Sequence, residues 1–79
     1  MFSLIQIMQT TILIFRTSIS KEQDMERVGF LLAQYPQISK WNVDLEDWEK
    51  VLRIECEDMT AGDITIALQT IGIDATELE

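Results

Sequence analysis

The chain contains no histidine, one cysteine (Cys56), one proline and three glycines. A single thiol cannot form an intrachain disulfide, and without imidazoles beside it the usual soft-ligand sites for zinc or copper cannot be assembled. No glycine-rich phosphate loop is present, and no nucleophile stands in a recognised catalytic motif. We therefore expect no cofactor and no catalytic residue, and we predict that the protein is not an enzyme.

Basic residues are also scarce, with 6 Lys and Arg against 14 Asp and Glu and a formal net charge of -8. A field of that sign repels the phosphates of nucleic acids and the headgroups of anionic lipids. The composition therefore argues against nucleic acid and membrane as partners. It favours a protein with a basic surface.

No apolar run reaches the length of about 20 residues that a membrane span requires. Residues 1–8 are mostly apolar, but they have no basic flank and polar residues follow them. We assign residues 1–10 to an N-terminal extension and residues 11–79 to a single domain. The apolar content of the whole chain, 47%, is ample for a core. The lone cysteine and the lack of a signal-peptide pattern favour a cytoplasmic setting.

The first half of the domain predicts a strand followed by a helix. A short run rich in β-branched and aromatic side chains indicates a buried strand over residues 11–17. Ser18 and Ser20, followed by acidic residues, are suited to the start of a helix. Pro36 should end that helix, because a proline pushes the preceding residue out of the α region. The apolar stripe of the helix consists of Met25, Val28, Leu32 and Tyr35.

A period of two begins at Ile38 and predicts a β-hairpin. One face of its first strand carries Trp41, Val43 and Leu45. The polar residues 46–49 break the pattern and form the predicted turn. The apolar face of the second strand consists of Leu52, Ile54 and Cys56. Cys56 is therefore expected in the core as a small apolar side chain rather than as a reactive thiol.

The last part of the chain predicts a second helix and a short strand. Thr60 followed by Asp63 resembles a capping box, and Gly72 is placed to end the helix in the left-handed conformation. Residues 73–78 form the expected final strand. The stripe of this helix consists of Ile64, Ala67, Leu68 and Ile71.

The resulting order of elements, βαββαβ, restricts the topology. Each β-α-β crossover is right-handed, which brings both helices to the same side of the sheet. The expected fold is an α+β, ferredoxin-like sandwich, in which a four-stranded antiparallel sheet carries two helices on one face.

Several short motifs between Thr11 and Leu78 are similar to those of a known family. They include Val28 and Leu32 in the first helix and three later motifs: Tyr35-Pro36-Gln37-Ile38, Asn42-Val43-Asp44-Leu45-Glu46 and Ile71-Gly72-Ile73. Together they make the chain resemble the heavy-metal-associated (HMA) domain, the fold of small copper chaperones and of the N-terminal modules of metal-pumping ATPases. The resemblance implies the same ferredoxin-like sandwich.

In metal-binding members of that family, a methionine and a Cys-x-x-Cys pair open the loop between the first strand and the first helix. The resemblance places the methionine at Ile19 and the two cysteines at Lys21 and Asp24. An ammonium group beside a carboxylate cannot replace a thiolate pair for Cu(I) or Zn(II), so we expect no metal site there. Lys21 and Asp24 are instead expected to form a weak ion pair with each other.

Without that metal site, protein contact is the leading functional hypothesis. We predict four contact residues, three in the hairpin and one in the first loop: Trp48, Asp47, Glu49 and Lys21. The alternative for Trp48 is that it folds back over the sheet edge, whereas Trp41 and Met25 are expected in the core. The partner is an unknown protein, expected to be basic, and a homodimer formed through a sheet edge stays open.

Two other classes of function are alternatives. Amino-acid-binding ACT domains share the order of elements, but they usually present a glycine after the first strand, where this chain has Ser18-Ile19-Ser20. The other alternative is a calcium site with oxygen ligands at the hairpin. Its ligands would be Asp44, Glu46, Asp47 and Glu49, although their spacing is not that of an EF-hand.

Overall fold

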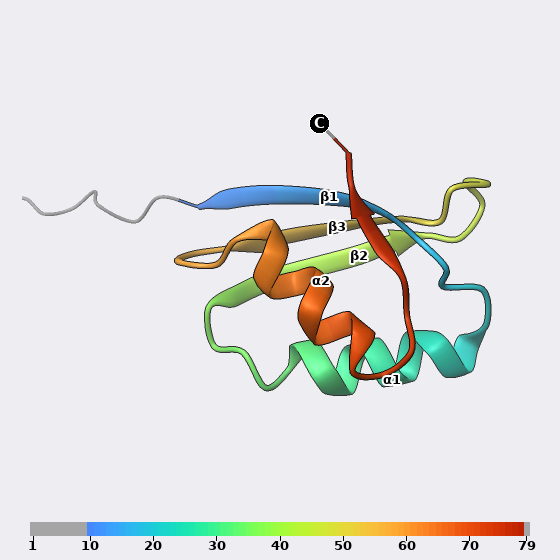
Figure 1. Cartoon of the computed structure of the whole chain (residues 1–79), viewed down its shortest axis with the longest axis horizontal. Helices are drawn as coiled ribbons and strands as arrows, with labels where there is room; N and C mark the ends of the chain where they lie inside the picture. The colour runs from blue at the N-terminus through green and yellow to red at the C-terminus, as the bar shows by residue number, and fades with distance from the viewer. Residues whose placement is uncertain (1–9, 79) are drawn as a thin grey trace, which may run out of the picture.

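The computed structural model describes residues 10–78. Its elements follow the predicted order βαββαβ (Figure 1). They are β1 (Thr11–Thr17), α1 (Glu22–Leu32), β2 (Ile38–Asp44), β3 (Val51–Cys56), α2 (Ala61–Gln69) and β4 (Ala75–Glu77). Apart from Thr10, the predicted N-terminal extension lies outside the described residues. No helix in the described part of the chain is long and apolar enough to cross a membrane.

The four strands form one antiparallel sheet in the order β2-β3-β1-β4. Both helices lie on the same face of this sheet, as Figure 1 shows. The register places Leu13 and Trp41 on either side of Ile54, near the middle of the sheet. The predicted ferredoxin-like sandwich is confirmed by this strand order and by the two helices on one face.

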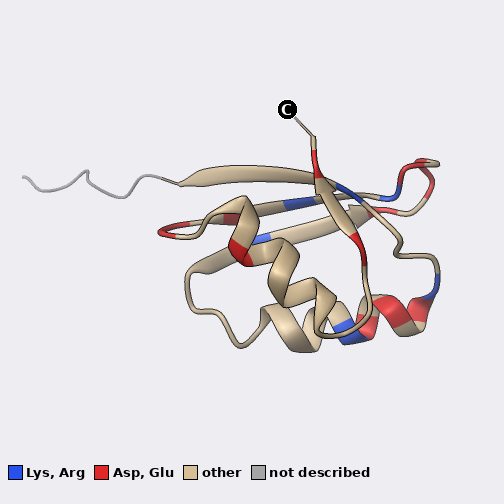
Figure 2. Cartoon of the chain, in the orientation of Figure 1, with Lys and Arg blue, Asp and Glu red and all other residues tan. Residues whose placement is uncertain are grey.

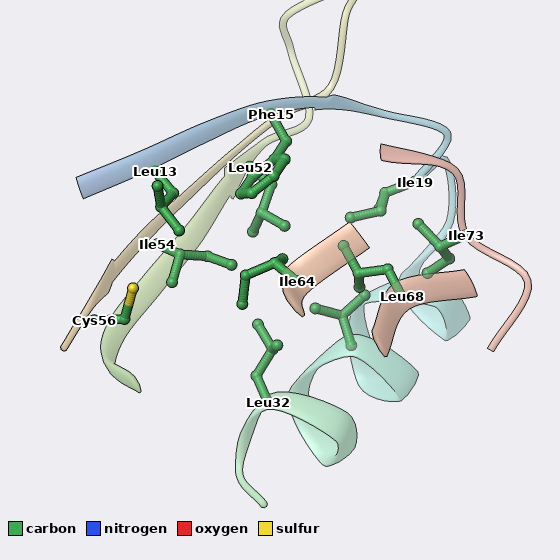
Figure 3. Packing of buried hydrophobic residues seen from close by; sticks show 11 residues of the cluster. Leu13, Phe15, Ile19, Leu32, Leu52, Ile54, Cys56, Ile64, Leu68 and Ile73 are labelled. Atoms are coloured by element: carbon green, nitrogen blue, oxygen red, sulfur yellow. The ribbon is translucent and has the colours of Figure 1, made fainter. Parts of the chain in front are cut away.

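The core fills the space between the sheet and the helices (Figure 3). Alternate residues of β1 and β3 point inward, and the apolar stripes of the helices meet them from the other side. Cys56 is fully buried, as predicted, whereas Trp41 and Met25 pack against the core and stay partly exposed. The buried cluster consists of Leu13, Phe15, Ile19, Val28, Leu32, Leu52, Ile54, Cys56, Ile64, Leu68 and Ile73.

Helix α2 begins as the sequence predicts, but its regular part ends at Gln69, so that Ile71 of the predicted stripe lies beyond the helix. The Thr60 hydroxyl accepts a hydrogen bond from the Asp63 amide (3.1 Å), and the Asp63 carboxylate accepts one from the Thr60 amide (2.9 Å). This reciprocal pair provides acceptors for amides that have none within the helix. At the other end, Gly72 has a φ of 77°, in the left-handed region that glycine enters without strain.

Helix α1 differs from its prediction at both ends. Its N-cap is Lys21 rather than a serine, and the carboxylate of Asp24 accepts hydrogen bonds from the amides of Ser20 (3.0 Å) and Lys21 (3.3 Å). The regular helix stops at Leu32, because the amides of Gln34 and Tyr35 bond to carbonyls three residues back rather than four. Pro36 therefore lies beyond this tighter turn instead of at the helix terminus.

Two strand boundaries also differ from the prediction. β2 ends at Asp44, so that Leu45, expected on the apolar face beside Val43, lies in the hairpin and is 37% exposed. The reason is that the Asp44 side chain binds amides of the turn and so starts it. β4 is shorter than the predicted strand, since Ile73 packs into the core before the strand begins.

Candidate functional site

Three connections meet at one end of the sandwich, which we call the loop end. It consists of residues 18–21 between β1 and α1, 45–50 between β2 and β3, and 73–74 before β4. The Thr17 amide, at the end of β1, donates to the Glu49 carbonyl of the hairpin (3.1 Å). The Ser18 amide donates to the Asp74 carbonyl, and the Asp74 amide to the Ser18 hydroxyl (both 3.0 Å). The end of β1 is therefore hydrogen-bonded both to the hairpin and to the segment before β4.

The acidic residues of the hairpin shape its backbone. The Asp44 carboxylate accepts hydrogen bonds from the amides of Glu46 (3.1 Å) and Asp47 (3.3 Å). The Asp47 carboxylate accepts one from the Glu49 amide (2.7 Å). These are Asx turns, in which a short acidic side chain takes the place of a backbone acceptor. Asp44 and Asp47 therefore have a structural role in the turn.

Lys50 closes the hairpin. Its φ of 49° lies in the left-handed region, which a residue with a side chain enters at a cost in free energy. Its ammonium donates to the Leu45 carbonyl (2.8 Å), and its carbonyl accepts from the Thr17 hydroxyl (2.6 Å). An ion pair between Arg16 and Glu49 (3.4 Å) adds a further link to β1. Side chains thus hold the hairpin on the end of β1.

Trp48 is 83% exposed on this ordered turn. Its indole faces solvent rather than folding back over the sheet edge. In Figure 2 the same hairpin carries acidic residues on both sides of its tip. An indole combines a large apolar surface with one hydrogen-bond donor, which is why tryptophan is enriched where proteins meet partners.

The predicted contact residues differ in exposure. Trp48 and Lys21 are exposed, whereas Asp47 and Glu49 are partly buried and already engaged, in the turn and with Arg16 respectively. Lys21 stands in the neighbouring connection, at the start of α1. The hairpin thus presents a single strongly exposed aromatic side chain, and its carboxylates contribute charge and backbone order around it.

The positions that the resemblance assigns to metal ligands have other roles in this fold. Ile19 is fully buried and closes the core beneath the first loop. The pKa of the Asp24 carboxyl is lowered, above all by the hydrogen bond from the Ser20 amide and also by that from the Lys21 amide. The ion pair that Asp24 forms is with Arg27 (3.7 Å), where the sequence predicts Lys21.

The acidic hairpin does not gather its carboxylates around a common point. Within residues 10–78, no group of three or more His, Cys, Asp or Glu side chains is placed to hold a metal ion. The carboxylates of Asp44 and Asp47 already accept backbone amides. Cys56 lies at the opposite end of the sheet, and burial raises the pKa of its thiol. The calcium hypothesis therefore gains no support from this geometry.

The structure also shows an exposed apolar region that the sequence patterns do not predict. Phe30 of α1 is 80% exposed and Ile66 of α2 is 66% exposed. Each lies two residues after a buried member of its helix, Val28 or Ile64, and therefore on the opposite side of that helix. A large apolar residue two positions after a core residue of a helix is therefore the sequence signal for such an exposed side chain.

Comparison with known proteins identifies the fold. No family model matches this chain, and no curated protein matches it. Among solved structures, the chain is similar to the apo form of the HMA domain of a copper chaperone for superoxide dismutase. The TM-score is 0.73 at 15% sequence identity, over 99% of this chain and 79% of that chain. The chain has an HMA-like fold. The predicted resemblance is thus confirmed at the level of fold.

Proposed function

We propose that this protein is a non-enzymatic binding module with an HMA-like fold, and that it acts by protein contact at its loop end. The observation that carries the proposal is Trp48, 83% exposed on a hairpin whose backbone is held by side-chain hydrogen bonds. A side chain on an ordered turn loses little conformational freedom when a partner covers it. Covering the indole removes a large apolar area from water, which favours association.

The partner that we propose is a protein with a basic surface. The net charge of -8 attracts such a protein, and the hairpin places the carboxylates of Glu46, Asp47 and Glu49 beside the indole. A lysine or arginine over the face of Trp48 would add a cation–π interaction. Charges of this kind raise association rates and exclude acidic partners more than they raise affinity.

The first loop supports a metal-free role. Ile19 packs in the core and Asp24 accepts backbone amides, so neither side chain is free to take the place of a metal ligand. Cys56 is the only cysteine, and it is buried. We infer that the protein binds no metal, catalyses no reaction and works in the cytoplasm, where a lone thiol stays reduced.

Native mass spectrometry of the untagged chain, isolated gently from its own cells, tests the proposal. One spectrum reports bound metal, small ligands and protein partners together. We expect a complex with a second protein that becomes at least about tenfold weaker in Trp48→Ala, because a central interface aromatic commonly contributes about 2 kcal/mol or more. Raising the salt concentration should weaken the complex of the parent chain, because salt screens the attraction between its acidic surface and a basic partner.

Ile12→Ala is the matched control. It truncates another exposed apolar side chain, 48% exposed on the outer face of the sheet, and should leave the complex intact. An added mass of metal or small-molecule size in place of a protein would contradict the proposal. A complex with the same affinity in Trp48→Ala would place the contact elsewhere on the surface.

A further inference from the structure

The helix layer carries a second apolar surface, which we call the helix face. Its exposed members are Phe30 and Ile66, at 80% and 66%. Partly buried side chains continue it between the two helices and beside them: Leu31, Tyr35, Met59 and Ile71. Exposed apolar groups that lie together on one side of a small domain mark a contact surface more often than scattered ones do.

The centre of the helix face carries no charge. Residues 28–39 and 64–73 contain no Lys, Arg, Asp or Glu, in a chain of which 25% is charged. Figure 2 shows the second half of α1 and most of α2 free of acidic and basic residues. Two chains that each carry a net charge of -8 repel each other over most orientations, and this face lets them approach without bringing like charges together.

The two ends of the helix face differ in shape and in the charged residues at their rims. At one end, Phe30 projects beside a shallow hollow of about 200 Å³ with Arg27 at its rim. The Arg27 guanidinium donates to the Ile71 carbonyl, which holds it at the junction of the helices, and it also pairs with the Asp24 carboxylate (3.7 Å) while its side chain stays half exposed. At the other end lies a larger hollow, of about 340 Å³, whose lining includes Met59, Ile66, Asp58 and Asp63.

The geometry points to a homodimer in which two helix faces meet around a two-fold axis. Phe30 of each copy enters the larger hollow of the other copy, beside Ile66. A two-fold interface forms every such contact twice, so both phenyl rings and both hollows are used. The same arrangement brings Arg27 of each copy toward Asp58 and Asp63 of the other. The uncharged face thus takes a second copy, whereas the acidic hairpin takes a basic protein.

Sedimentation equilibrium of the full chain, from about 1 µM to about 1 mM, tests this proposal. We expect a reversible monomer–dimer equilibrium. Phe30→Glu should raise its dissociation constant at least about tenfold, because the substitution places an unpaired carboxylate in an apolar contact bordered by acids. Ile14→Glu is the matched control: Ile14 lies on the outer face of the sheet opposite Arg53, so this variant should dimerise like the parent chain.

Charge reversal tests the arrangement of the two copies. Arg27→Glu should weaken the dimer, and adding Asp58→Lys should restore it, since the pair of reversals exchanges the charges across the interface. Asp58 has a φ of 57°, and Lys50 shows that a lysine adopts this conformation in the same chain. Failure of the restoration overturns the two-fold arrangement.

A chain that stays monomeric over the whole concentration range, or a dimer that survives Phe30→Glu, overturns the proposal as a whole. Both results leave the role of Trp48 untouched, because that role is measured as a complex with a different protein. Conversely, loss of the Trp48 hypothesis leaves the monomer–dimer equilibrium as it is. The two proposals therefore fail separately.

Discussion

The core and the loop end of this domain are held together by different interactions. Beneath the sheet, a cluster of apolar side chains excludes water, and the described residues include no buried polar or charged side chain. At the loop end, the carboxylates of Asp44 and Asp47 accept backbone amides, the Thr17 hydroxyl donates to a backbone carbonyl, and Arg16 forms an ion pair with Glu49. The Trp48 indole is left in water. Burial supplies most of the stability of such a domain, and directional polar contacts supply the shape of its surface.

The difference matters for function because the two kinds of interaction differ in strength. Burying one large aliphatic side chain stabilises a fold by about 1.5 to 3 kcal/mol, whereas one hydrogen bond contributes about 0.5 to 1.5 kcal/mol net. Substitutions of exposed side chains in the hairpin should therefore alter contact properties with small effects on folding. Substitutions in the core should do the reverse.

Ile54→Ala should produce the largest loss of stability. Ile54 is fully buried in the middle of the sheet, so its truncation removes apolar contacts and leaves a cavity. We expect the free energy of unfolding, measured by urea denaturation, to fall by about 2 to 5 kcal/mol. Ile12→Ala removes the same atoms from a side chain that is 48% exposed and should cost less than about 1 kcal/mol. Equal losses of unfolding free energy in Ile54→Ala and Ile12→Ala would contradict the placement of Ile54 in the core and of Ile12 at the surface.

Thr17→Val should have an intermediate effect, confined to the loop end. The Thr17 hydroxyl donates to the Lys50 carbonyl (2.6 Å) and accepts from the Ile19 amide (3.2 Å), so the substitution removes two hydrogen bonds at nearly constant volume. We expect a loss of roughly 1 to 2 kcal/mol in the same urea titration. Thr76→Val, at an exposed position of the neighbouring strand, is the control and should change little. If the two variants unfold alike, the hairpin does not depend on Thr17.

Asp24→Asn should have the smallest effect on stability, and that effect should depend on pH. The pKa of Asp24 is lowered in the folded protein, so the carboxylate stabilises the fold fully at pH values above its unfolded pKa. That contribution is lost as the pH falls through the lowered folded value. The parent chain should therefore lose more stability than Asp24→Asn between neutral and acidic pH, as measured by urea denaturation at each pH. Glu22→Gln, in the same turn of α1, is the control, and acid sensitivity that persists unchanged in Asp24→Asn would contradict the assignment.

Much of the fold could be predicted because its signals are local. A period of two marks β2 and β3, helical spacing marks both apolar stripes, and Thr60 with Asp63 marks the start of α2. The start of α1 could not be predicted in the same way. At the start of α1 the Asp24 carboxylate accepts the amides of Ser20 and Lys21, and the path of the loop brings these amides within its reach. That path depends on the bonds between Ser18 and Asp74, which are 56 positions apart.

The candidate sites show the same division. The sequence predicts Trp48 as a contact residue, but the exposure of its side chain depends on a hairpin held to β1 by Thr17 and Lys50, which are 33 positions apart. Phe30 and Ile66 belong to no motif, and they are exposed on two helices that lie on the same face of the sheet. The residue types of the candidate sites could therefore be predicted in part from the sequence, whereas the exposure and placement of their side chains could not.

The sequence by itself determined the order of the elements, the apolar faces that make the core, and the lack of histidine and of a second cysteine, on which the expectation of no soft-ligand metal site rests. Each of these follows from residue types and from spacings within a few positions along the chain. Tertiary structure alone decided that Asp24 caps α1, that the Trp48 indole stands in water, and that Phe30 and Ile66 share a face. The physical reason is that these outcomes depend on which distant backbone amides, carbonyls and side chains come together when the sheet forms.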